Sequence, residues 1–542
     1  MPSMPSEQAE NQVVRLLPTQ AACLVGVCAL WLGSFGLLEA VRLHLAFQWS
    51  FFGASLLLLL WAGVLFSSAQ GAGRTFELKV ALRKQHFVQA LAQGLFFLYW
   101  GWYWSPLYDS AFLILAQLVF AYGFNMLLCW SRRDRFILGF GPFPVIFSVN
   151  LFLWFRDDWF YLQFLLVAFG FLVKELIHWS RDGQRVHIFN PSSFPLAVFS
   201  LALILTENTE ITWAQDIATS QFYPPHVYLV LFLVALPGQY FFGVASMTLS
   251  AVVATYVFGL IYFGVTGVYF FYDSYIPIAV FLGMHLLFTD PSTAPKTELG
   301  RLMFGILYGL TTVGLYSLLS QAGVPPVYDK LLQVPVLNLS VQLLDRLGRS
   351  STLRRWQFKP GFLSWGGYKA DASRPGLVCL GIWLLVFTGM TAARALGDEH
   401  PGQWVPFWQK ACRDQRPGAC RYLTDMQRRF CDSGSGWACN EAGILRSTWP
   451  HPITERPWIR LAEVRALLQQ GCDLSFEAAC VNLKGANDEV GQFQQDLPTL
   501  VDWPIVLRGT KGPLENLSPS GLYARACSQE WPEACGWENG DD

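Results

Sequence analysis

Two polar segments interrupt the apolar body of this chain: His187-Ile-Phe-Asn-Pro-Ser-Ser-Phe194 and Phe288-Thr-Asp-Pro-Ser-Thr-Ala-Pro-Lys-Thr-Glu-Leu-Gly-Arg301. Each segment stands where one long apolar stretch ends and another begins. Polar and charged groups are costly in a bilayer unless other groups compensate them. The two segments are therefore the first candidates for a functional site, and the apolar stretches around them indicate the class of fold.

The composition is typical of a membrane protein. Of the 542 residues, 53% are hydrophobic and only 14% are charged, whereas soluble domains contain roughly 25% charged residues. The net charge of −1 gives no sign of a nucleic-acid partner. We expect an all-α fold in which a polytopic bundle of roughly 12–13 spans, some of them broken, precedes a disulfide-linked domain of helical hairpins. The expected spans are 20–41, 48–69, 87–106, 110–130, 136–155, 158–177, 189–206, 226–236, 239–265, 274–289, 301–320, 326–345 and 376–396.

The distribution of charge predicts how these spans are oriented. Lys and Arg mark cytoplasmic connections, and here they cluster on alternate connections, around 74–84, 132–135 and 181–185, while the intervening connections carry acids. The basic stretch 348–375 is also expected in the cytoplasm, which requires the polar stretch 326–345 to cross. The N-terminus is then cytoplasmic and the chain after about residue 396 lies outside, most simply in the periplasm beyond a bacterial inner membrane.

The cysteines of the tail follow a regular spacing. Two residues eight apart in one continuous helix lie too far from each other for a disulfide, so the chain must turn between them. We expect four local bridges, each joining the end of one helix to the start of the next, in an oxidising compartment. Zinc is the competing interpretation, but the spacing is not that of zinc ligands. The expected pairs are Cys412/Cys420, Cys431/Cys439, Cys472/Cys480 and Cys527/Cys535.

This cysteine pattern resembles the disulfide-linked variant of Sel1-like helical repeats. The resemblance implies stacked helical hairpins that bind another protein, because such repeats build extended binding surfaces. The alternative is that the tail merely caps the membrane part.

Each polar segment is predicted to contain a helix break. Pro191 excludes Asn190 from an ordinary helix, so a new helix begins near Ser192. Its N-terminus would suit a phosphate or another anion, unless Asn190, Ser192 and Ser193 serve only as a cap. In the second segment Asp290 and Arg301 either pair with each other or hold the polar edge of a cofactor.

Together these motifs resemble the RnfD/NqrB family of membrane proteins, which belong to the Rnf electron-transport complex and to the sodium-translocating NADH:quinone reductase. The resemblance covers residues 135–347. The motifs that carry it are Lys174, the His187–Ser192 segment, Pro237-Gly238, the Phe288–Thr297 segment with Gly300-Arg301, Asn338 and the Leu-Leu-Asp345 end. It implies a membrane flavoprotein fold in a redox-driven ion pump, with FMN attached to a threonine on the outer side.

The attachment motif of that family is only partly present. Asp216 and Ala218-Thr219 correspond to parts of it, but its serine-glycine is missing. Thr219 is therefore the candidate for covalent attachment, and a noncovalent flavin is the main expectation. The cofactor-binding candidates that follow from the resemblance and from the two breaks are Lys174, His187, Asn190, Ser192, Thr289, Asp290, Thr293, Arg301 and Thr219.

The leading interpretation is a component of an electron-transfer oxidoreductase that works with partner subunits or electron-transfer proteins. The alternatives are a transporter or ion-conducting protein without a redox cofactor, and a membrane anchor for an external interaction domain.

The expected domains are 1–134 (N-terminal helices), 135–347 (the region of resemblance), 348–375 (basic connection), 376–396 (last span) and 397–542 (cysteine-rich domain).

Overall fold

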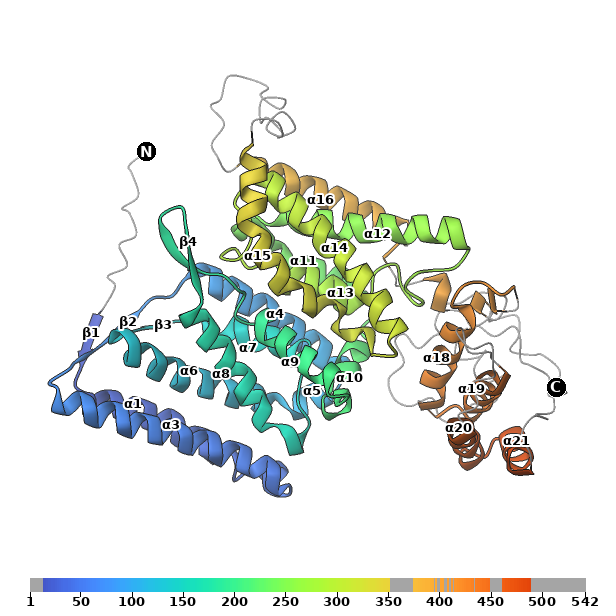
Figure 1. Cartoon of the computed structure of the whole chain (residues 1–542), viewed down its shortest axis with the longest axis horizontal. Helices are drawn as coiled ribbons and strands as arrows, with labels where there is room; N and C mark the ends of the chain where they lie inside the picture. Colours follow the sequence, from blue (N-terminus) through green and yellow to red (C-terminus); the bar gives the residue numbers. More distant parts are fainter. Residues whose placement is uncertain are drawn as a thin grey trace. The chain divides into compact units, whose positions relative to one another are not determined.

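The computed structural model describes residues 13–350, 374–393, 395–396, 400–403, 407–408, 411–412, 414–432, 434–448 and 461–488. The described chain is mainly helical, so the expected all-α class is confirmed (Figure 1). In the membrane part the helices are α1 (Pro18–Phe35), α2 (Glu39–Arg42), α3 (Leu45–Gly71), α4 (Lys84–Tyr103), α5 (Pro106–Asp109), α6 (Ala111–Arg133), α7 (Pro142–Asn150), α8 (Tyr161–Leu176), α9 (Ser193–Leu205), α10 (Ala214–Ser220), α11 (Val227–Phe242), α12 (Ala245–Thr266), α13 (Ile278–Leu282), the π-helix η3 (Gly283–Leu287), α14 (Glu298–Gln321), α15 (Asp329–Arg349) and α16 (Arg374–Ala392).

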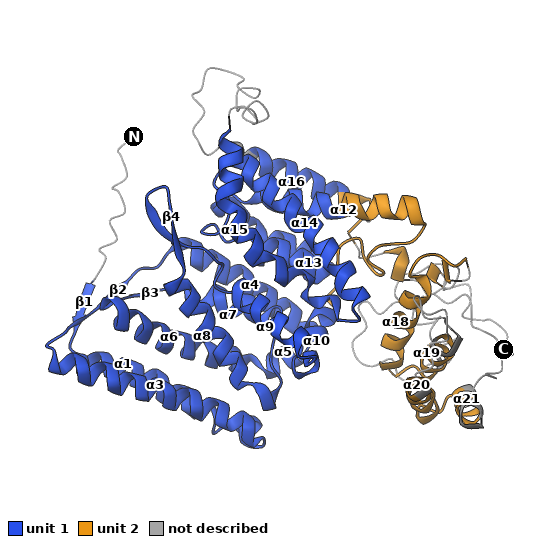
Figure 2. Cartoon of the chain, viewed as in Figure 1, with its two compact units in different colours: residues 1–222, 226–255, 278–389 blue, residues 223–225, 256–277, 390–542 orange. Residues whose placement is uncertain are grey.

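The tail continues with α18 (Ala419–Asp432), α19 (Gly436–Thr448), α20 (Leu461–Asp473) and α21 (Glu477–Asp488). The described chain divides into two compact units (Figure 2). The first comprises residues 1–222, 226–255 and 278–389, and the second comprises 223–225, 256–277 and 390–542. The connection between α12 and α13 therefore belongs to the same unit as the cysteine-rich tail.

Several helices have the length and apolarity that a membrane requires. Among the described helices, five qualify as spans by these criteria, namely α1, α3, α6, α12 and α14. Shorter apolar helices lie at Ser193–Leu205, Val227–Phe242, Ile278–Leu287 and Val378–Ala392. Every stretch expected to cross contains a helix, but several of these helices are too short to cross alone. Such short helices are typical of broken elements that are packed against protein.

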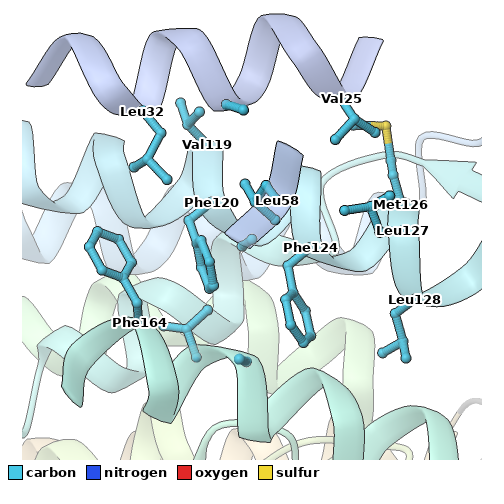
Figure 3. Packing of buried hydrophobic residues seen from close by; sticks show 14 of the residues in the cluster. Val25, Leu32, Leu58, Val119, Phe120, Phe124, Met126, Leu127, Leu128 and Phe164 are labelled. Atoms are coloured by element: carbon cyan, nitrogen blue, oxygen red, sulfur yellow. The ribbon is translucent and has the colours of Figure 1, made fainter. Parts of the chain in front are cut away.

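Aromatic and aliphatic side chains make the core of the first unit. Figure 3 shows Val25 and Leu32 of α1, Leu58 of α3, Phe120 and Phe124 of α6 and Phe164 of α8 within one buried cluster. Phe120 and Phe164 meet with their ring centroids 5.0 Å apart. This cluster fixes α8, whose last turn leads into the first polar segment.

Glycines allow α14 to approach α12 closely. A Cβ atom on Gly305 would lie 2.1 Å from the Met247 carbonyl oxygen, and one on Gly309 would lie 2.7 Å from the Ala251 carbonyl oxygen. The two glycines are four residues apart on one face of α14, an arrangement that lets membrane helices pack backbone to backbone. The position of α14, which begins at the second polar segment, follows from this contact.

Two small sheets were not predicted. Strand β2 (Phe76–Val80) pairs antiparallel with β1 (Val13–Leu16) and parallel with β3 (Arg135–Leu138). Strands β4 (His178–Arg181) and β5 (Gln184–His187) form an antiparallel hairpin that leads into the first break.

Helix α11 ends later than the expected span 226–236. Pro237 lies inside this helix, and the break comes at Gly243, which adopts a φ of +63°. Helix α11 continues for five residues past Pro237, and it ends where Gly243 permits the left-handed turn.

Candidate functional site

The first break lies between α8 and α9. The β4–β5 hairpin turns at Asp182-Gly183, where both residues have positive φ, and returns the chain to Asn190-Pro191. Gly170 of α8 lets this segment pack closely, because a Cβ there would lie 2.4 Å from the Pro191 carbonyl oxygen. Helix α9 then begins at Ser193, as predicted.

The second break follows the π-helix η3. The Thr289 hydroxyl donates to the His285 carbonyl oxygen at 2.9 Å. Asp290 then organises a turn, since its Oδ1 accepts the Ser292 N–H at 3.0 Å and its carbonyl oxygen accepts the Thr293 N–H at 3.2 Å. Thr297 ends the turn by capping α14, accepting the Gly300 N–H at 3.1 Å.

The two breaks bind each other directly. The Asn190 side-chain amide donates to the Leu287 carbonyl oxygen at 3.0 Å. Asn338 of α15 joins both segments, because its Oδ1 accepts the Asn190 N–H at 3.2 Å and its amide donates to the Thr293 carbonyl oxygen at 3.3 Å. Asn190 and Asn338 are each about 1–4% exposed. The structure thus brings Asn190, Thr289, Asp290 and Thr293 together through contacts between residues up to 148 positions apart.

Charged groups gather at this junction. His187 Nε2 lies 3.7 Å from Asp290 Oδ2, and Asp290 is also the main electrostatic partner of the Lys174 ammonium on α8. Burial alone would raise the pKa of the Asp290 carboxyl, but His187 and the Ser292 N–H more than offset burial and lower this pKa to about 2. Asp290 is therefore ionised at neutral pH and faces two basic side chains.

Arg301 pairs with a residue of its own helix. Its Nη1 pairs with Glu298 Oε1 at 2.9 Å, and its Nε donates to the Pro295 carbonyl oxygen at 3.0 Å. Glu298 in turn accepts the Ser246 hydroxyl of α12 at 2.8 Å. The anticipated Asp290–Arg301 pair does not form, because the Arg301 guanidinium reaches one helical turn back to Glu298.

Sequence reasoning missed the ion pair that holds the second turn in place. Arg181 Nη2 lies 2.7 Å from Asp345 Oδ2, with the two side chains only 5% and 7% exposed. Arg181 also donates to the Ala294 carbonyl oxygen at 2.9 Å, and Asp345 Oδ1 accepts the N–H groups of Lys296 and Thr297 at 2.8 and 3.0 Å. Arg181 had been assigned only to the cytoplasmic charge cluster, since nothing in the sequence links it to a residue 164 positions later.

At the first break the backbone N–H groups expected to bind a phosphate are not free, but two unpaired polar atoms lie close to it in the described chain. The N–H groups of Ser192 and Ser193, proposed above for a phosphate, both donate to Asn190 Oδ1 at 2.9 and 3.2 Å, so the start of α9 is capped. Two buried polar atoms nearby in the chain, His187 Nε2 and Ser193 Oγ, have no hydrogen-bond partner within the described residues. His187 Nε2 faces Asp290, whereas the Ser193 hydroxyl can donate to a carbonyl or nitrogen acceptor of a ligand.

Thr219 lies far from this junction. It belongs to α10. The segment around α10 contacts the residues just before α8, because Arg156 lies 3.8 Å from Asp216 and Phe155 forms a β-bridge with Thr212. Lys174 lies in the last turn of the same helix. Because α8 has 16 residues and rises about 1.5 Å per residue, its two ends are roughly 24 Å apart. Thr219 therefore lies at the opposite end of α8 from Lys174. Pro191 packs on Gly170, nine residues or roughly 14 Å along the axis from the start of α8, so Asn190 lies between these two ends.

The second unit confirms three of the four expected disulfides, Cys412–Cys420, Cys431–Cys439 and Cys472–Cys480, each with 4.6 Å between alpha carbons. Cys527 and Cys535 lie outside the described residues. The helices linked in this way pack as neighbours, with α19 between α18 and α20, and Asn440 of α19 bonds to Asn482 of α21 at 2.8 Å.

The same unit includes the aromatic connection between α12 and α13. Arg429 of α18 lies 3.3 Å from Asp273 Oδ2 and 4.7 Å from the Tyr272 ring centroid. The Tyr422 hydroxyl donates to the Phe270 carbonyl oxygen at 3.0 Å. Val268, Trp408 and Phe430 share one buried cluster with Tyr422. The tail and the α12–α13 connection thus pack together within the second unit.

Comparison with known proteins gives no further identification: no family model matches the chain, and no curated protein or solved structure is found to be similar. Among the described residues there is also no group of three or more His, Cys, Asp or Glu side chains that could hold a metal ion.

Proposed function

We propose that this chain is a membrane component of an electron-transport complex, of the RnfD/NqrB type. The observation that supports it is the mutual binding of the two breaks that carry the resemblance, through the 3.0 Å bond from Asn190 to the Leu287 carbonyl oxygen. Broken helices that meet within a bundle are a recurrent way to build a site inside a membrane.

A flavin held without a covalent bond is the proposed cofactor. When bound, it supplies one- and two-electron transfer. In this proposal Ser193 donates to the polar edge of the ring, and Lys174 offsets the negative charge of a reduced flavin. Asp290 keeps His187 oriented across their 3.7 Å separation. Thr219, which is remote from this junction, remains a separate candidate for covalent attachment.

The absorption spectrum of the full chain, purified in mild detergent, tests the proposal. We expect the blue-absorbing band of an oxidised flavin, lost on acid precipitation of the protein, and a lower flavin-to-protein ratio in Asn190→Leu and Asp290→Asn. Asp158→Asn, at an exposed position, is the matched control and should keep the ratio. A folded wild-type protein without the band contradicts the proposal, and a flavin that stays on the denatured chain supports attachment at Thr219 instead.

The second candidate is a transporter or ion-conducting protein without a redox cofactor. It is favoured by Asp290, which is held ionised at the junction between Lys174 and His187, because ionisable groups at membrane depth commonly mark ion or proton pathways. Absence of flavin, combined with a loss of ion flux in Asp290→Asn vesicles, would support this function.

The orientation proposed from charge places the N-terminus in the cytoplasm of an inner-membrane protein and the tail in the periplasm. Three disulfides support an oxidising compartment for the tail. The 3.3 Å ion pair of Asp273 with Arg429 supports the same side for the α12–α13 connection. A thiol reagent that cannot cross the membrane is added to intact cells. It should label Ser274→Cys poorly while the tail disulfides are intact and strongly after they are reduced. It should not label Ser292→Cys under either condition. The reverse labelling would invert the orientation. In this arrangement the helical tail also offers an outer surface for a protein partner.

A further inference from the structure

A second polar site lies among α11, η3 and α16, apart from the break junction. His285 stands on the π-helix η3 and is 3% exposed. Its Nδ1 lies 2.7 Å from the Phe281 carbonyl oxygen. A carbonyl oxygen can only accept, so Nδ1 carries the hydrogen and Nε2 presents a lone pair. Nε2 is buried and has no hydrogen-bond partner in the described part of the chain.

Trp383 of α16 supplies the complementary group. Its ring centroid lies 6.0 Å from that of His285, with 29° between the planes. The indole is fully buried, and its Nε1–H likewise lacks a partner among the described residues. An unpaired acceptor and an unpaired donor thus stand on neighbouring rings, in a setting where leaving either of them unpaired is costly.

Gln239 is a third side chain without hydrogen-bond partners, on the face of α11 that carries Phe232. It is 1% exposed, and neither its amide nitrogen nor its oxygen has a partner in the described structure. It lies seven residues after Phe232, and so on the same helix face. Phe232 contacts both rings, with centroid distances of 6.4 Å to His285 and 5.3 Å to Trp383.

The surroundings restrict the chemistry of a ligand. The rings packed on His285 belong to Phe232, Phe281 and Trp383, none of which carries a charge to balance an imidazolium or a charged ligand. Phe232 and Phe387 stack at 3.7 Å, which leaves no room for a ring between them. A single hydroxyl oxygen satisfies both orphaned atoms, because it can donate to one nitrogen and accept from another up to about 5.6 Å away, twice a normal hydrogen-bond length.

We propose that His285 and Trp383 bind the hydroxyl group of an uncharged, lipid-soluble ligand, which donates to His285 Nε2 and accepts from Trp383 Nε1–H. A π-helix at this position agrees with the frequent occurrence of such irregularities at functional sites. Trp383 lies outside the region 135–347 that resembles the electron-transport proteins, whereas His285 lies within it; the proposed hydroxyl contact needs no flavin and can be tested without one. The same hydroxyl chemistry has a second source, a single buried water, and the experiment distinguishes the two.

The test uses the full chain in mild detergent with 4-pentylphenol as the probe and pentylbenzene, which has the same shape but no hydroxyl, as the control ligand. We expect 4-pentylphenol to raise the unfolding temperature saturably and pentylbenzene to give only a small, non-saturating change. His285→Phe and Trp383→Phe should each weaken the apparent affinity for the phenol at least fivefold. Trp159→Phe, at an exposed tryptophan, should leave it unchanged.

Nitrogen-15 NMR of labelled histidine distinguishes the sources of the hydroxyl. If the proposal is right, the Nε2 signal of His285 moves from that of a free to that of a hydrogen-bonded neutral imidazole as the phenol binds. If Nε2 is already hydrogen-bonded without the phenol and does not respond to it, water alone fills the site and the ligand proposal is overturned. Equal effects of phenol and pentylbenzene, or an unchanged phenol affinity in folded His285→Phe and Trp383→Phe, overturn it as well.

Discussion

Replacement of Asp345 by Asn should strongly destabilise the membrane unit. The substitution keeps an oxygen for the Lys296 and Thr297 N–H groups, which now bond to Asp345 Oδ1 at 2.8 and 3.0 Å. It removes the charge that faces Arg181 at 2.7 Å, where the two side chains are 5% and 7% exposed. Loss of one partner of such a buried pair costs about 3–5 kcal/mol, because the other charge stays buried without compensation.

Chemical unfolding of the full chain in detergent micelles measures this effect, with Asp158→Asn as the exposed control. Arg181→Met should be similarly destabilising, since it leaves the Asp345 carboxylate buried alone. The double variant Arg181→Met/Asp345→Asn should be more stable than the sum of the two single losses by at least about 1 kcal/mol, the coupling expected of residues in one network. If Asp345→Asn unfolds within about 1 kcal/mol of wild type, the pair does not hold the 292–297 turn and the reasoning is wrong.

Two further predictions concern helix packing and the tail. Gly305→Ala should destabilise the first unit by about 1–3 kcal/mol, because the alanine Cβ would lie 2.1 Å from the Met247 carbonyl oxygen. Gly314→Ala is the control in the same unfolding assay. Because no atom lies close to Gly314, this substitution should be neutral or slightly stabilising. Burial raises the pKa of Glu441 from 4.5 to about 7, so its protonated form is favoured by folding; its contribution to stability is complete below pH 4.5 and is lost as the pH rises through 7. The wild-type tail should therefore lose about 2–3 kcal/mol more than Glu441→Gln between pH 5 and pH 8, as measured by pulse proteolysis in urea, and equal pH slopes would exclude this burial effect.

The class of fold and the local bridges could be predicted from the sequence because their signals are local. Apolar stretches of sufficient length appear as helices such as α1 and α3. The repeated cysteine spacing needs only a turn between two helix ends, and Cys431–Cys439 forms as predicted. The start of α9 was predictable for the same reason, because Pro191 acts on its immediate neighbour.

The candidate site could be predicted only in part, since its contacts are long-range. The sequence indicated Asn190 and Asp290 as residues of two breaks, but the bond from Asn190 to residue 287 and the bridge through Asn338 depend on how the helices pack. For Arg301 the sequence left two roles open, a pair with Asp290 or contact with the polar edge of a cofactor; the pair does not form, because Arg301 binds Glu298. The β4–β5 hairpin was missed because its residues are polar and its only local sign is the Asp182-Gly183 turn.

Electron transfer across a vesicle membrane tests the central claim most directly. The full chain is reconstituted into liposomes that enclose ferricyanide, and dithionite is added outside. Ferricyanide should be reduced faster in vesicles with the wild-type chain or with Asp158→Asn than in empty vesicles, and Asp290→Asn should abolish the difference. Equal rates in wild-type, Asp290→Asn and empty vesicles, from a folded protein shown to be inserted, would contradict a role in transmembrane electron transport.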